Sequence, residues 1–248
     1  RILSSAASDV YKRQARDDNG VVNENATLNV TNGANKNETG GSYDANGEHS
    51  GDVIDTTNTA SKDTDPDGDS LSVSAVRLGS TEGSGTSGTV GVALTGTYGQ
   101  LTLNANGSYT YVANQPAADL LDAGDIAYDY FNYTVTDTSL TDTALLTIRI
   151  NGVNDDVTAV NDFGVVTENA TLTVTDGESQ NLSGSYDTHD EHSGDVAANE
   201  QDADASAVHT ITAIRTGLTE GSGTSGSLGS ALTGTYGQLT LNANGSYT

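Results

Sequence analysis

The residues best suited to chemistry are the acidic side chains of the segment DTDPDGD. Carboxylates occupy alternate positions in this segment, and the strand-like sequence LSVSAV follows it. Hard cations such as Ca²⁺ take about six to eight oxygen ligands, and a loop with this spacing can wrap several carboxylates around one ion. Gly68 can adopt the positive φ that a sharp turn requires. The segment therefore predicts a calcium site made by Asp63, Asp65, Asp67 and Asp69.

The resemblance of this loop to an EF-hand is incomplete. Its first six residues fit an EF-hand loop, but the twelfth position is Ser74 instead of a bidentate Glu, and a strand follows where a helix is required. A solvated acidic turn is the alternative interpretation. Later in the chain the related segment is reduced to DADAS at 202–206, so we expect any second site to be weaker or lost.

A second group of acids lies near residue 160. It comprises Asp155, Asp156, Asp162 and Glu168, and the first part of the chain has similar acids at Asp17, Asp18 and Glu24. Carboxylates from the end of one domain and the start of the next can share an ion, which would fix the angle between the domains. A flexible linker that binds no metal is the equally weighted alternative.

The chain contains an internal repeat, which sets its domain organisation. The fifteen residues GTYGQLTLNANGSYT occur at Gly96–Thr110 and again at Gly234–Thr248. Gly20–Val30 likewise matches Gly164–Val174. We therefore predict a first repeat at 15–158 and a second at 159–248 that lacks counterparts of the last strands. Residues 1–14 match neither copy and are interpreted as a foreign or disordered leader.

Alternating polar and apolar residues predict an all-β fold. The repeated segment indicates a hairpin with its turn at Asn104–Gly107. A strand pair or bent strand is predicted at 21–30, and strands are predicted at 71–76, 89–94, 128–135 and 144–150. Leu120 and Leu121 are expected to close one end of the core, and Tyr109, Tyr111, Tyr130 and Tyr133 to lie in the core or on a sheet face. Strands of this number and length, without a helical pattern, favour tandem antiparallel β-sandwich repeats of the immunoglobulin or cadherin-like kind.

These motifs resemble a known bacterial module. GTYGQLTLNANGSYTYV, DAGDIAYDYFNYTVTD, TDTALLTIRI and NGVNDDVTAVND are similar to the VCBS repeat, and DTDPDGDSLSV is similar to bacterial cadherin-like repeats. The resemblance implies a β-sandwich used as a spacer or adhesive unit in large secreted adhesins and RTX-type exoproteins. It also implies calcium as a bound ion and neighbouring repeats of the same chain as partners.

Composition restricts the partners and the compartment. The formal net charge is −25, and the chain has no Cys. An excess of carboxylates disfavours nucleic acid and anionic membranes as partners. No apolar run approaches the roughly 20 residues that span a bilayer. We expect a secreted location, outside the cell or on a bacterial surface, with metal ions in place of disulfides.

The sequence favours a non-catalytic function. His49, Ser50 and Asp52 invite comparison with a Ser-His-Asp triad, but triads are assembled from distant segments, so a loop in which Asp52 or Glu48 binds backbone or metal is preferred. We therefore expect a calcium-stiffened stalk or adhesion unit. The alternatives are a calcium-dependent module that binds exopolysaccharide or a host cell surface, and an accessory repeat of a secreted hydrolase or toxin.

Overall fold

A computed structural model describes residues 15–37, 48–54, 63–65, 68–182 and 191–248. The chain forms two compact units, which comprise residues 1–154 and 155–248. The leader at 1–14 lies outside the described residues.

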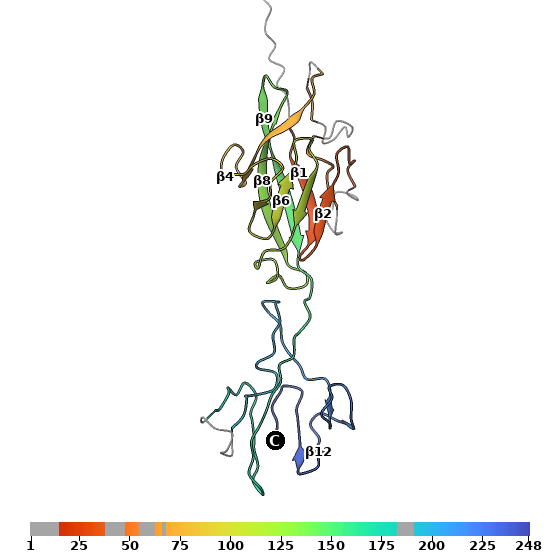
Figure 1. Ribbon diagram of the computed structural model, residues 1–248, viewed down its shortest axis with the longest axis vertical. Coiled ribbons are helices and arrows are strands. Elements are labelled where there is room, and N and C mark those ends of the chain that lie inside the picture. The colour runs from red at the N-terminus through yellow and green to blue at the C-terminus, as the bar shows by residue number, and fades with distance from the viewer. Residues whose placement is uncertain (1–14, 38–47, 55–62, 66–67, 183–190) are drawn as a thin grey trace, which may run out of the picture. The chain divides into compact units, whose positions relative to one another are not determined.

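The first unit is a β-sandwich, which confirms the predicted fold class. One sheet has the strand order β1-β9-β8-β3-β4 and the other has the order β2-β7-β6-β5. Figure 1 labels β1, β4, β8 and β9 of the first sheet, and β2 and β6 of the second. The strands are β1 (Asp18–Asn23), β2 (Thr27–Val30), β3 (Ser72–Leu78), β4 (Thr86–Ser87), β5 (Leu94–Thr95), β6 (Gln100–Leu103), β7 (Tyr109–Val112), β8 (Ile126–Thr136) and β9 (Thr141–Asn151). One core cluster contains buried residues from both sheets, so the two sheets pack face to face.

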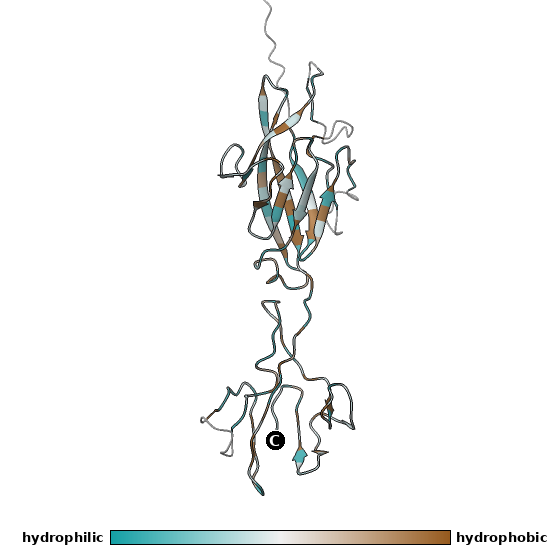
Figure 2. Cartoon of the chain, in the orientation of Figure 1, coloured by the Kyte–Doolittle hydropathy of each residue, from teal (hydrophilic) through white to brown (hydrophobic). Residues whose placement is uncertain are grey.

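The hairpin of β8 and β9 supplies much of this core. Its inward residues include Phe131 and Tyr133 from β8, and Leu146 and Ile148 from β9, all of them fully buried. Their period-two spacing puts them on one face of the sheet, opposite the β6–β7 hairpin. The Tyr111 ring meets Phe131 edge to face, with ring centroids 6.2 Å apart. Along the strands of this unit, hydrophobic residues are interspersed with polar ones (Figure 2).

The repeated hairpin forms as its sequence predicts. The strands β6 and β7 pair antiparallel, with Leu101 opposite Tyr111 and Leu103 opposite Tyr109. In the turn, Gly107 has a φ of 89° and its N–H donates to the carbonyl of Asn104 at 3.0 Å. All four of the paired side chains are buried.

The first strands depart from a wholly antiparallel arrangement. The strand β1 pairs parallel with β9, with Val22 beside Ile150, and the chain then crosses to the other sheet, where β2 pairs antiparallel with β7. The turn between them places Asn25 at a φ of 57°. A single predicted segment, 21–30, therefore contributes a strand to each sheet and holds their edges together.

Some local predictions were wrong. The segment predicted as a strand at 89–94 contains Gly91, which has a φ of 79°, and only Leu94–Thr95 pairs as β5. Leu120 is 55% exposed and does not close the core, whereas Leu121 packs against it. The prediction for Tyr130 holds, since this residue lies on a sheet face: it has the opposite parity to Phe131 and Tyr133 and is on the solvent face of β8.

The second unit repeats part of this architecture. Its strands are the short pairs β10 (Ile214–Arg215) with β11 (Ser225–Gly226), and β12 (Leu232–Thr233) with β13 (Gln238–Leu239). A bridge between Val174 and Tyr247 reproduces the pairing of Val30 with Tyr109 in the first unit. The second unit therefore keeps the register of the β2-β7-β6-β5 sheet.

Candidate metal site

Two carboxylates of one loop and a third that is distant in sequence meet in the first unit. Asp65 and Asp69 precede β3, and Asp137 follows β8. One carboxylate oxygen from each lies within 4.8 Å of the others. Among the residues that the structure describes, this is the group of acids placed to share a metal ion. All the donors are oxygens, which suits Ca²⁺ and disfavours metals that prefer nitrogen or sulfur.

Strand pairing and turns position this site. The start of β3 pairs with the end of β8, with Ser72 opposite Thr136, so the residues just outside the two strands are neighbours. Gly68 has a φ of 79° and donates its N–H to the carbonyl of Asp65 at 3.3 Å, which confirms its predicted role in the turn. Asp137 Oδ1 accepts the N–H groups of Ser139 and Leu140 at 2.7 and 2.9 Å, which fixes its side chain.

The other two predicted ligands of this loop fall outside the group. Asp63 is buried, and its Oδ1 accepts the N–H of Arg16 at 2.9 Å, so it ties the start of the unit to the loop. Asp67 lies outside the described residues. Asp137 was not among the predicted ligands.

A buried acid close to Asp63 has unusual proton affinity. Asp18 on β1 is buried, and its carboxylate lies 2.6 Å from Tyr133 Oη and 2.8 Å from Ser50 Oγ. Burial raises the pKa of Asp18 to about 8; the hydrogen bonds from Tyr133 and Ser50 oppose this shift, and the nearby carboxylates Asp63 and Asp52 add to it. Burial and the charge of Asp18 also raise the pKa of Tyr133.

Protonation of Asp18 allows both Tyr133 Oη and the carbonyl oxygen of Arg16 to accept a hydrogen bond. Tyr133 Oη also lies 2.8 Å from the carbonyl of Arg16, and one hydroxyl hydrogen serves only one acceptor at a time. When Asp18 carries a proton it can donate to Tyr133, which then donates to Arg16. The geometry thus provides a physical reason for a neutral carboxyl in this position.

The neighbouring His-Ser-Asp sequence does not form a triad. The Ser50 hydroxyl donates to Asp18, and His49 Nδ1 accepts the N–H of Gly51 at 3.1 Å. Asp52 accepts backbone N–H groups from Gly33 and Ile54 at 2.5 and 3.1 Å. Asp52 therefore holds loops together, as the preferred sequence interpretation expected.

Asp129 is a second residue that sequence reasoning missed. It lies on the inward face of β8, where it is buried. Its carboxylate accepts the N–H groups of Thr97, Tyr98 and Gly99 at 2.9, 3.1 and 3.2 Å, and the hydroxyl of Tyr111 at 2.7 Å. Burial and this carboxylate raise the pKa of Tyr111. The signal was the inward parity of Asp129, since a buried carboxylate needs several donors.

The predicted ligands near residue 160 belong to the second unit and are spread out. The N–H of Asp155 donates to Asp204 at 3.0 Å, while Asp156 and Glu168 are exposed. Asp162 accepts Ser193 Oγ at 2.7 Å and Asn199 Nδ2 at 3.0 Å. Within the described part of the chain these four acids do not come together as one group. In the first unit, Glu24 accepts the N–H of Val153 and so supports the backbone after β9.

The strand arrangement of the first unit is that of an all-β sandwich with two packed sheets. Residues 42–149 match the family model described as a bacterial Ig domain. This region of the chain is therefore similar to a bacterial Ig domain. A comparison with curated proteins finds no match. In the described residues there is no helix long and apolar enough to cross a membrane.

Proposed function

We propose that the chain is a repeat module of the VCBS type from a large bacterial surface or secreted protein, and that it acts as a non-catalytic stalk or adhesion unit stiffened by Ca²⁺. The convergence of Asp65, Asp69 and Asp137 carries this proposal. An ion at this position would join the loop before β3 to the turn after β8. The similarity of residues 42–149 to a bacterial Ig domain and the acidic composition of the chain support a location outside the cell.

The chemistry of the site matches weak extracellular calcium binding. Three carboxylates supply part of the coordination shell, and water can supply the remainder because Asp69 is exposed. Sites of this kind bind calcium with dissociation constants of about 0.1 to 1 mM. Calcium at millimolar concentration would then occupy the site and reduce the electrostatic repulsion among the three carboxylates.

Replacing Asp137 with asparagine should weaken calcium binding at least about tenfold, because it removes a charged ligand from the ion. Isothermal titration of the full chain with calcium measures the effect. The matched control is Asp125→Asn, which removes an exposed carboxylate from the same unit outside the site. Equal affinities for the two variants would exclude this site. Magnesium, which prefers strict octahedral geometry, should bind more weakly than calcium.

A second candidate function rests on exposed aromatic rings. Tyr128 and Tyr130 are 45% and 37% exposed on the outer face of β8, and their rings stack with centroids 6.1 Å apart. Flat aromatic surfaces of this kind can stack on the apolar faces of sugar rings. This observation favours an exopolysaccharide as the ligand of an adhesion unit.

The double variant Tyr128→Ala/Tyr130→Ala should abolish binding to any glycan that the chain retains on a glycan array. Tyr236→Ala serves as the control, since it removes a fully exposed tyrosine elsewhere. Running the array with calcium and with EDTA shows whether the ion takes part. Silence of the unmodified chain under both conditions would leave the stalk function and discard the glycan function.

A further inference from the structure

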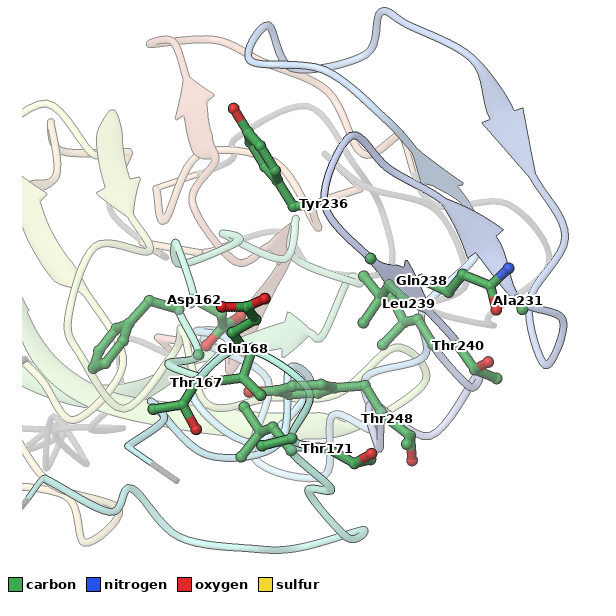
Figure 3. A pocket seen from close by; sticks show the side chains of 18 of the residues that line it. Asp162, Thr167, Glu168, Thr171, Ala231, Tyr236, Gln238, Leu239, Thr240 and Thr248 are labelled. Atoms are coloured by element: carbon green, nitrogen blue, oxygen red, sulfur yellow. The ribbon is translucent and has the colours of Figure 1, made fainter. Parts of the chain in front are cut away.

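The second unit contains an open groove where the first unit has its core. The groove has a volume of about 1190 Å³ and is lined mainly by two segments, 162–172 and 236–241. Figure 3 shows the first segment, with Asp162, Thr167 and Glu168, on one side and the second, with Gln238, Leu239 and Thr240, on the other. Several of the residues that line it, such as Val166, Leu239 and Leu241, are counterparts of residues that are buried in the core of the first unit.

Counterpart residues of the two units differ in their exposure to solvent. Val22 and Leu101 are fully buried in the first unit, whereas their counterparts Val166 and Leu239 are 51% and 40% exposed. Gly20 lies close to Leu28, Tyr109 and Ile148 of β9. Its counterpart Gly164 keeps the corresponding neighbours Leu172 and Tyr247, and within the described residues these two side chains supply all three of the nearest atoms, without a third side chain such as Ile148. The apolar surface is thus preformed and its cover is absent from the described residues.

The backbone on both sides of the groove lacks strand partners. In the first unit, β9 pairs with β1 and β8 pairs with β3, so the hairpin occupies the middle of a five-stranded sheet. Within the described residues, the counterpart of β1, at 162–167, forms only a bridge at Gly164, and the counterpart of β3, at 210–216, pairs as a strand only at β10. Two sheet edges therefore face a gap that two strands would fill.

Polar groups of the loop 234–237 indicate which side chains a ligand of the groove would carry. The loop 234–237 has the same closing hydrogen bond as its counterpart, from Gly234 N–H to Gly237 O at 2.9 Å. In the first unit the N–H groups of this loop bind Asp129. In the described part of the second unit no carboxylate accepts them, and Tyr236 is fully exposed.

Two acids provide complementary anchors. Asp162 is the counterpart of Asp18, which contacts the hydroxyl of Tyr133. Glu168 is the counterpart of Glu24, which accepts a backbone N–H just after β9. Asp162 lines the groove and Glu168 is exposed beside it. The site therefore presents N–H donors for one carboxylate and a carboxylate for one tyrosine hydroxyl.

We propose that this groove binds a β-hairpin with the sequence pattern of β8 and β9, by strand addition at two sheet edges. An aspartate at the position of Asp129 enters the loop 234–237, and a tyrosine at the position of Tyr133 hydrogen-bonds to Asp162. Apolar residues at the positions of Phe131, Leu146 and Ile148 fill the groove. Main-chain pairing supplies affinity, and the side chains at alternate positions supply specificity.

The test adds a synthetic peptide of residues 124–153, the hairpin peptide, to the full 248-residue chain. We expect saturable one-to-one binding in a fluorescence anisotropy titration. Hydrogen exchange should slow at 162–167 and 210–216 of the chain when the peptide binds. The Asp129→Asn and Tyr133→Phe forms of the peptide should each bind about tenfold or more weakly, since each loses a hydrogen bond to a charged group.

Variants of the chain separate groove binding from nonspecific association. Leu239→Asp puts a charge in the groove at a position that is already partly exposed, so the unit can still fold; it should weaken binding at least about tenfold. Leu218→Asp makes the same change at a fully exposed position outside the groove and should leave binding unchanged. No binding of the hairpin peptide, or equal binding by the peptide and chain variants, overturns the proposal. Self-association of the chain that the peptide does not reverse also overturns it.

Discussion

Replacing Asp129 with alanine should lower the free energy of unfolding of the first unit by about 4 kcal/mol. Three backbone N–H groups and the Tyr111 hydroxyl donate to this carboxylate. Removal leaves these donors unsatisfied in a buried place, and each such group costs about 1 to 3 kcal/mol, less where water enters. The loss should appear as faster hydrogen exchange throughout β8 and β9, measured by mass spectrometry under native conditions.

The Asp125→Ala variant is the control for this prediction. Asp125 is exposed and lies one residue before β8, so its removal should change stability by less than about 0.5 kcal/mol. Asp129→Asn should be intermediate, because an amide keeps one acceptor oxygen. Similar exchange rates for Asp129→Ala and Asp125→Ala would contradict the structural role given to Asp129.

The second large effect is a loss of stability as pH rises. The pKa of Asp18 is about 8 in the folded state against 3.8 as its ordinary value, so the folded state binds the proton more tightly than the unfolded state. Between these values the folded state holds more protons, and stability therefore falls with rising pH. The Asp18 contribution is intact below about pH 4 and fully lost above about pH 8, with a total change of roughly 6 kcal/mol.

The variant Asp18→Asn isolates this effect, because asparagine resembles the protonated acid and does not titrate. Its stability relative to the unmodified chain should rise steadily between about pH 4 and pH 8. Urea unfolding followed by hydrogen exchange in β8 and β9 gives the comparison at each pH. A constant difference across this range would show that Asp18 titrates normally.

The fold was largely accessible from local sequence patterns. Alternation predicted β8 and β9, and Asn104–Gly107 predicted the turn that joins β6 to β7. The parallel pairing of β1 with β9 was not predicted, because it joins opposite ends of the unit and leaves no local signal. Leu120 was misplaced for a similar reason: hydrophobicity alone does not say which of two neighbouring leucines faces inward.

The candidate metal site was only partly accessible. Alternate spacing identified Asp65 and Asp69, but it also selected Asp63, whose carboxylate serves the backbone of Arg16. Asp137 enters the site through the pairing of Ser72 with Thr136, a long-range register that a single sequence does not reveal. Asp129 was marked by its inward parity in an apolar strand, a signal that could have been used.

The most direct test of calcium stiffening is the melting temperature of the full chain, measured in calcium and in EDTA. If Ca²⁺ joins the loop before β3 to the turn after β8, calcium at 100 times its dissociation constant should add about 2.7 kcal/mol. This corresponds to a rise of roughly 5 to 10 °C in the melting temperature of the first unit, and Asp137→Asn should remove most of it. The same melting temperature in calcium and in EDTA would contradict calcium stiffening.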